Sequence, residues 1–293
     1  MAEQRYVGGQ AVIEGVMMRG ERRWAVAVRR PDGGIELAVN DAPGWAERWS
    51  KIPLARGVVT LAESVSLGMK ALSFSAAASS DEEEKPGKGE MAGGVVVALL
   101  LFVGVFILVP ALLARASGLR GSIAFNAFEG AVRLLLFLGY IVAIGRVPDI
   151  KRVFQYHGAE HKSIAAYENG VELTPANAQR FTTEHVRCGT NFLLTVMVLT
   201  IVCYSVFGRP GLALLLLSRA VLIPVIAGLA YELIRLAARN MHRHWVRVAM
   251  RPGLLLQRLT TREPTDDQVE VAIAALRAAL TAEQLAEVEA RAA

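Results

Sequence analysis

Two histidines four residues apart are the feature of this sequence that most directly suggests chemistry. They open and close the stretch His157-Gly158-Ala159-Glu160-His161. On a helix, side chains four positions apart project from one face, so the two imidazoles can bind a single metal ion. The order His-x-x-Glu-His is the inverted form of the zincin motif, in which the glutamate serves as base for a zinc-bound water. Glu160 is therefore the candidate catalytic residue.

A second cluster of metal-binding residue types follows within the same polar segment, residues 146–190. The stretch TEHVRCGTN contains His185 and Cys188 in His-x-x-Cys spacing. Cys188 is the only cysteine in a polar context, because Cys203 lies in an apolar run. Both ends of the segment adjoin apolar runs, so bringing the two clusters together costs little closure entropy. We predict a zinc site whose ligands come from His157, His161, His185 and Cys188.

Two coordination geometries are open at such a site. If all four residues bind, the coordination sphere is closed and the ion is structural. If one is absent, a water can occupy the fourth position and Glu160 can activate it. Glu168, seven residues after His161, offers a substitute ligand or an acceptor for an imidazole N–H. The alternative to a metal site is a solvated helix with two polar histidines and a buried cysteine.

Long apolar runs must position this polar segment. Hydrophobic residues make up 53% of the 293-residue chain and charged residues only 20%. A bilayer core needs about 20 apolar residues in helical form. Four runs meet or approach that length: 94–116, 123–145, 191–208 and 211–238. Arg209-Pro210 predicts a hairpin turn between the last two. We predict a mainly α polytopic membrane protein with about four transmembrane helices and a small α+β cytoplasmic part.

The distribution of Lys and Arg predicts the orientation of these helices. Most of them lie in residues 1–90, 146–190 and the tail after Arg235, whereas the two alternate loops hold only Arg115, Arg120 and Arg209. Because positive residues favour the cytoplasmic side, both termini and the His/Glu/Cys segment are predicted to be cytoplasmic. The net charge of +5 then reflects cytoplasmic loops, so no nucleic-acid partner is expected.

Polar residues within the apolar runs form a second candidate site. Asn126, Glu129 and Arg133 follow helical spacing of three and four and make one polar stripe, and Arg219 lies inside the fourth run. Charges at the centre of a bilayer are costly, so these side chains should face one another or a water-filled cavity. A functional role is one interpretation. The other is an internal pair between Glu129 and Arg133.

The remaining segments predict a soluble part around the helices. WAVAVRR and IELAV flank Pro-Asp-Gly-Gly and predict a β-hairpin, and GGQAVIEGVMMRG upstream predicts one more strand. Thr265 and Gln268 form a capping box that starts a C-terminal helix. The predicted division is 1–53 cytoplasmic β-rich segment, 54–78 amphipathic helix, 79–91 flexible linker, 92–145 first two spans, 146–190 His/Glu/Cys loop, 191–238 last two spans and 239–293 cytoplasmic C-terminal segment.

Several long stretches together resemble the YqhQ-like family of bacterial membrane proteins. They are GGQAVIEGVMMRG, PDIKRVFQYHGAEHKSIAAYENG, RCGTNFL, GLAYELIR and PGLLLQRLTTREPTDDQVEVAIAAL. The resemblance implies a multi-pass protein of the bacterial inner membrane, from a family of unknown function whose members are labelled metal-dependent enzymes. His157, Glu160, His161, His185 and Cys188 match the polar motif positions of the family.

Two positions depart from the family pattern as we expect it. The expected His-Pro-Arg-Cys is replaced by His185-Val186-Arg187-Cys188, and the expected aspartate of the second run is replaced by Glu129. The lost proline loosens a turn but keeps the candidate ligands, and Glu129 keeps the charge.

Two functions of different classes follow. The first is a zinc-dependent hydrolase that cleaves a peptide or another amide near the membrane, with Glu160 as base. The second is a non-enzymatic assembly or quality-control partner of other membrane proteins, in which any metal is structural. The lipid bilayer is a partner in both, and the sequence does not fix the oligomeric state.

Overall fold

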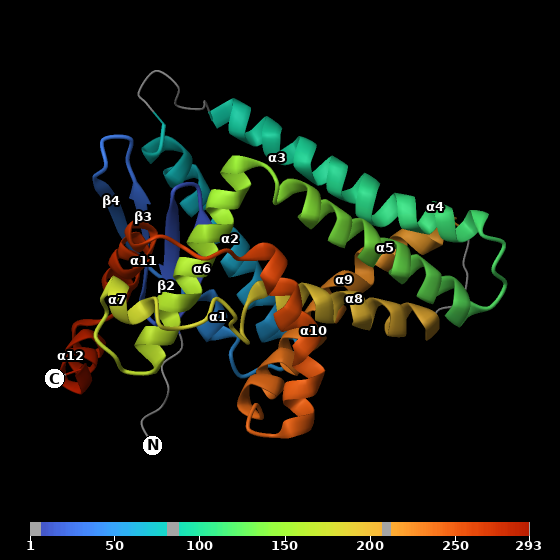
Figure 1. The fold of residues 1–293 in the computed structure, drawn as a ribbon. Coiled ribbons are helices and arrows are strands. Elements are labelled where there is room, and N and C mark those ends of the chain that lie inside the picture. The colour runs from blue at the N-terminus through green and yellow to red at the C-terminus, as the bar shows by residue number, and fades with distance from the viewer. Residues whose placement is uncertain (1–6, 81–87, 207–211, 293) are drawn as a thin grey trace.

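The computed structural model describes residues 7–80, 88–206 and 212–292. Within these ranges the molecule has two parts: a lobe built around a small sheet, and long helices that extend away from it side by side (Figure 1). Four helical stretches are long and apolar enough to cross a membrane: Ala92–Ala116, Ser122–Ile144, Gly189–Val206 and Val221–Arg239. The predicted fold class, a mainly α polytopic protein with a small β part, is confirmed.

The sheet has four antiparallel strands in the order β1-β2-β3-β4. Their bounds are Gly8–Val12, Gly15–Arg19, Arg23–Arg29 and Ile35–Asp41. The predicted hairpin is β3 and β4. The upstream stretch, predicted as one strand, instead forms β1 and β2, because the chain reverses at Ile13-Glu14 and pairs Val12 with Gly15. Glu14 takes a φ of 50°, a conformation that glycine adopts more readily than glutamate.

Helices cover both faces of this sheet. Alternate residues of a strand point to opposite faces, so Val16 and Met18 of β2 pack toward α6 (Pro148–Glu168) and α11 (Asp266–Ala279). Met17 of the same strand packs toward α2 (Ala55–Ala78) with Leu67. The lobe is therefore a three-layer sandwich of helix, sheet and helix, and α6, which carries the His-x-x-Glu-His motif, forms part of its core.

The helix α2 also joins the sheet to the long helices. Its buried Glu63 pairs with Arg19 of β2, with Nε and Oε1 2.8 Å apart. Arg56 at its start pairs with Glu232 of α9 (Leu212–Arg239). The amphipathic helix predicted over 54–78 thus packs on the sheet along one side and on a candidate membrane helix at one end.

The first apolar stretch is not a regular α-helix. It consists of α3 (Lys88–Val103), a π-helical turn η2 (Gly104–Leu108) and α4 (Val109–Ala116). The helix α3 begins inside the predicted linker 79–91, of which 81–87 lie outside the described residues. The two following spans are α5 (Ser122–Ile144) and α8 (Gly189–Val206), which pack against each other. In addition, α5 packs against α4, and α8 packs against α9. The predicted turn at Arg209-Pro210 also lies outside the described residues.

The C-terminal segment contains three helices where the sequence predicted one. They are α10 (His244–Thr260), α11 and α12 (Ala282–Ala292). The predicted capping residues are at the start of α11, where the Gln268 side chain accepts the Thr265 backbone N–H at 3.0 Å. Short helices α1 (Trp45–Arg48) and α7 (Pro175–Ala178) complete the lobe.

Candidate metal centre

The motif helix α6 buries the residues that follow His157. Gly158, Ala159, Glu160 and His161 are all buried, together with the next three residues. Gly158 allows the chain after α10 to approach the helix closely, because a Cβ on this residue would lie 2.1 Å from the Arg262 carbonyl oxygen. Gly158 is thus a close contact point between α6 and the segment that follows α10.

Three of the predicted metal ligands converge. The ligand atoms of His157, His161 and Cys188 all lie within 4.8 Å of one another. The two imidazole rings are 4.5 Å apart between centroids, and the Cys188 Sγ is 3.3 Å from His157 Nε2. His161 is 1% exposed and Cys188 7% exposed. The cluster is therefore a compact and largely enclosed group of two nitrogens and one sulfur.

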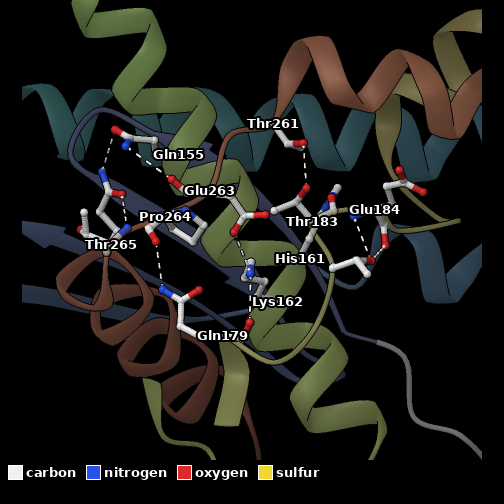
Figure 2. Close-up of polar contacts among 12 residues, drawn as sticks. Gln155, His161, Lys162, Gln179, Thr183, Glu184, Thr261, Glu263, Pro264 and Thr265 are labelled. Carbon is white, nitrogen blue, oxygen red and sulfur yellow. Dashed lines mark hydrogen bonds and ion pairs between the residues drawn. The ribbon is translucent and has the colours of Figure 1, made fainter. Parts of the chain in front are cut away.

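Backbone carbonyls fix the tautomer of both histidines. His157 Nδ1 lies 2.9 Å from the Thr260 carbonyl oxygen. His161 Nδ1 lies 2.5 Å from the Thr183 carbonyl oxygen, and Figure 2 shows His161 beside Thr183. A carbonyl oxygen can only accept, so both Nδ1 atoms carry hydrogen and donate it. Each neutral ring then keeps its lone pair on Nε2. Metal-binding histidines in proteins are held in the same way by an acceptor on the other ring nitrogen.

The surroundings of the cluster favour the states that bind metal. Burial lowers the pKa of His161, an effect that hydrogen bonding to Cys188 partly opposes. The Thr190 hydroxyl donates to the Cys188 Sγ at 3.3 Å. A neutral imidazole is the form in which histidine coordinates a metal, and the Thr190 hydrogen bond orients the Cys188 sulfur.

His185 lies beside the cluster but is not part of the three-residue group. Its ring centroid is 5.5 Å from that of His161, and its Nε2 is 3.5 Å from the Glu168 Oε2. Gln257 holds the backbone of His185 from both sides, accepting its N–H and donating to its carbonyl, each at 2.8 Å. The buried Nε2 makes no hydrogen bond with the described residues.

Glu168 holds the His185 side chain in its position beside the cluster. It pairs with Arg187 as well as with His185. Burial alone would raise the pKa of Glu168, but His185 and Arg187 outweigh it and lower that pKa. Glu168 is therefore a carboxylate that lies between His185 and Arg187 and pairs with both.

Glu160 lies next to the cluster on the side facing the sheet. It is 5% exposed, and its carboxylate accepts the backbone N–H of Gly9 in β1. A Cβ on Gly9 would lie 2.9 Å from the Glu160 Cγ. Burial raises the pKa of Glu160, while His157, His185 and the Gly9 hydrogen bond oppose that rise. Glu160 is thus a buried carboxyl group adjacent to the ligands without being one of the three.

The polar stripe on α5 is organised differently. Arg133 Nη2 lies 2.5 Å from Glu129 Oε1 one turn away, and Arg133 Nε donates to the Phe106 carbonyl oxygen at 2.8 Å. Phe106 belongs to the π-helical turn. The Asn126 amide donates to the Ser122 carbonyl of the same helix at 2.9 Å. Arg219 lies in α9, but its side chain is outside the described part. The stripe therefore contains the internal Glu129–Arg133 pair, which was one of the two interpretations of the sequence.

Some residues of the candidate centre could not be found from the sequence. Thr183 and Thr260 act through backbone carbonyls, which every residue possesses, so no residue type marks them. Gln257 is a neutral side chain on α10 far along the chain from His185. Gly9 carried a faint signal, because paired glycines at the start of a strand suggest close approach of another group.

The fold and the cluster together define a class of protein: four helices of membrane-spanning length attached to a sheet-containing lobe with a buried His/His/Cys group. The family model described as "Protein of unknown function (DUF1385)" matches residues 52–282. "Uncharacterized protein YqhQ" of Bacillus subtilis (strain 168) is 38% identical over 301 residues, covering 96% of this chain and 94% of that protein. No solved structure matches significantly. The chain belongs to the DUF1385 family, and the resemblance predicted from the motifs is confirmed.

Proposed function

We propose that this protein is a membrane metalloprotein that binds one zinc ion through His157, His161 and Cys188 at the cytoplasmic surface of the bacterial inner membrane. The observation that carries the proposal is the pair of Nδ1–H hydrogen bonds to the Thr260 and Thr183 carbonyls. They leave both Nε2 lone pairs available beside the Cys188 sulfur. This is the orientation that two histidines need in order to bind one metal ion together with the cysteine.

The donor set favours zinc over other biological metals. Calcium and magnesium select oxygen ligands, whereas two imidazoles and one thiolate suit a borderline-soft ion. Zinc is tetrahedral in proteins and takes nitrogen and sulfur ligands. Three protein ligands supply all but one of the positions that zinc requires.

The three-ligand count favours a hydrolase. Zinc held by three protein ligands provides a Lewis acid and lowers the pKa of a water in its fourth position. Glu160 adjoins His161 and is held by the Gly9 N–H, so it is the residue to accept and return a proton. The helix α6 begins four residues after α5 ends. The substrate class that fits this position is a peptide or another amide at the membrane surface.

A structural role is the second candidate, and the burial of the ligands favours it. His161 and Cys188 are almost fully enclosed. The cluster joins α6, the start of α8 and, through the Thr260 carbonyl, the end of α10. In that role zinc would hold these three elements together in a non-enzymatic assembly or quality-control partner of other membrane proteins.

Metal analysis of purified protein tests zinc binding. The double substitution His157→Ala/His161→Ala should abolish the stoichiometric zinc that the wild-type protein retains. His242→Ala/His244→Ala is a matched control, because it removes two exposed histidines outside the cluster. Equal zinc in the wild type and the His157/His161 variant would contradict the proposal.

Substitution of Glu160 separates the two roles. Glu160→Gln should retain zinc in both, whereas only the hydrolase loses its chemistry. The measurement compares the peptide termini of membrane proteins from cells that carry Glu160→Gln, wild type or the exposed control Glu172→Gln. Cleavage products present in the wild type and control but absent in Glu160→Gln support hydrolysis. Identical termini in all three would leave the structural role.

A further inference from the structure

The helix α10 carries an apolar stripe on its outer side. Trp245, Val248 and Leu255 are 65%, 44% and 55% exposed. At 100° per residue they fall within one narrow sector of the helix. Val246, Gly253 and Leu256 lie on the adjacent side of the helix and are buried. The helix α10 is therefore apolar on two sides, and only one of them packs against the described protein.

A row of arginines borders this outer stripe. Arg247, Arg251 and Arg258 follow spacing of four and seven along α10, and all three are exposed. Arg258 pairs with Glu184. Among the residues that the structure describes, Arg247 and Arg251 form no ion pair. The sequence from residue 233 to residue 262 contains seven arginines and neither Asp nor Glu. The outer surface of α10 thus combines an apolar stripe with unneutralised positive charge.

The place of α10 in the fold is at the end of the long helices. A Cβ on Gly253 would lie 2.0 Å from the Asn191 Oδ1, so the middle of α10 is in close contact with the first turn of α8. Asn191 is the third residue of that candidate membrane helix. Four residues separate the start of α10 from the end of α9. In Figure 1, α10 lies across the direction of α8 at the junction of lobe and bundle.

We infer that α10 is an interfacial helix that binds anionic phospholipid of the same bilayer that the four long helices cross. Its apolar stripe lies at the boundary of headgroups and acyl chains, where Trp245 is at the depth that tryptophan prefers. Arg247 and Arg251 lie at headgroup level and contact lipid phosphates. Clusters of Lys and Arg next to a membrane helix attract anionic lipid in this way.

The bilayer fits this surface better than a soluble partner does. An acidic protein would neutralise the arginines, but it would have to cover an apolar stripe that begins beside the membrane ends of α8 and α9. The bilayer already lies against those ends and supplies both an apolar and an anionic layer. The inference rests on the membrane topology and not on the zinc site. Zinc content therefore serves as an independent readout.

Fluorescence of the full-length protein in lipid nanodiscs tests the inference. The difference between wild type and Trp245→Phe isolates the emission of Trp245 from the other three tryptophans. We expect lipid brominated on its acyl chains to quench this emission, and aqueous acrylamide to quench it weakly. If Trp245→Phe fails to fold, as judged by size-exclusion chromatography, the added emission of Val248→Trp reports from one turn further along α10.

The anionic preference has its own comparison. At equal mole fraction, brominated phosphatidylglycerol should quench Trp245 more than brominated phosphatidylcholine does. Arg247→Gln/Arg251→Gln should remove this difference, with a loss of local anionic lipid of about fivefold per arginine. Arg22→Gln/Arg23→Gln, which removes two exposed arginines of the sheet lobe, should keep it.

Three results would overturn the inference. Strong quenching of Trp245 by acrylamide without quenching by brominated lipid would place α10 in water or against a soluble partner. Equal quenching by the two brominated lipids in the wild type would exclude an anionic preference. A preference that survives Arg247→Gln/Arg251→Gln would assign it to other residues. Zinc should remain bound in every variant, so these outcomes are distinct from failure of the metal site.

Discussion

The His/His/Cys cluster and the polar stripe on α5 are both groups of polar side chains in places where burial is costly. They differ in the partners of their hydrogen-bonding atoms. In the stripe, Glu129 and Arg133 face each other along one helix, and Arg133 also donates to the Phe106 carbonyl. In the cluster, the outer nitrogens of His157 and His161 are bonded to carbonyls and the inner nitrogens face a sulfur.

This difference distinguishes a structural polar group from a binding site. A charged pair that satisfies itself lowers the cost of its own burial and leaves little to offer a ligand. A cluster whose supporting hydrogen bonds are complete and whose lone pairs converge on one point is prepared for a cation. The cluster therefore carries the functional proposal, and the stripe is assigned to the stability of the helix bundle.

Of the substitutions that test this difference, removal of the Cys188 sulfur should have the largest effect, a loss of zinc affinity. Cys188→Ser replaces the only sulfur ligand proposed for zinc, so zinc affinity should fall by more than the about 10- to 100-fold that supporting residues contribute. Cys203→Ser, within α8, should bind zinc as the wild type does. Competition with a chromogenic chelator measures both. Unchanged affinity in Cys188→Ser would remove the distinction between the two regions.

Breaking the α5 pair should affect stability and not metal. Glu129→Ala leaves Arg133, whose side chain is 13% exposed, without its carboxylate, which should lower the free energy of unfolding by about 3 kcal/mol. Glu129→Leu/Arg133→Leu should recover most of that loss because neither charge remains. Unfolding in detergent with parallel zinc analysis checks this. Loss of zinc from folded Glu129→Ala protein would show that the stripe belongs to the metal site.

A methyl group on Gly158 should disturb the cluster through its support. The added Cβ would meet the Arg262 carbonyl and displace the segment that carries the Thr260 carbonyl. Gly158→Ala should cost about 1 to 3 kcal/mol in unfolding free energy by overpacking and should weaken zinc binding. Gly139→Ala on α5, where a Cβ meets nothing within 4 Å, is the matched control. Equal behaviour of the two variants would disprove the supporting role.

The smallest effect is expected from His185. Because it pairs with Glu168 and lies outside the three-residue group, His185→Ala should change zinc affinity less than about tenfold and cost about 1 kcal/mol in stability. Metal titration of the variant gives the answer. A large loss of affinity would make His185 the fourth ligand, close the coordination sphere and favour the structural role over hydrolysis.

Much of the fold follows from local sequence patterns. The four apolar stretches, the β3–β4 hairpin and the start of α11 were predicted because hydropathy, turn residues and capping residues act over short distances. The division into β1 and β2 was not predicted. The turn between them has a positive φ at Glu14, and glutamate is not a residue type that indicates such a turn. The helices α10 and α12 were not predicted, and α10 packs against α8, a contact that no local pattern indicates.

The candidate site could be predicted only in part for the same reason. Spacing brought His157 and His161 to one face, and polar context singled out Cys188. In the sequence, His185 and Cys188 were equally good candidates for a metal ligand. The structure separates them because Gln257, 72 residues away along the chain, and Glu168 hold His185 beside the cluster. The supporting carbonyls depend on the packing of whole segments, which residue types do not encode.

X-ray absorption at the zinc edge of the purified wild-type protein identifies the atoms around the ion. We expect one sulfur at about 2.3 Å and nitrogen or oxygen neighbours at about 2.0 to 2.1 Å, with the sulfur signal absent from Cys188→Ser. A zinc environment without sulfur, or a sulfur signal that persists in Cys188→Ser, would contradict this expectation.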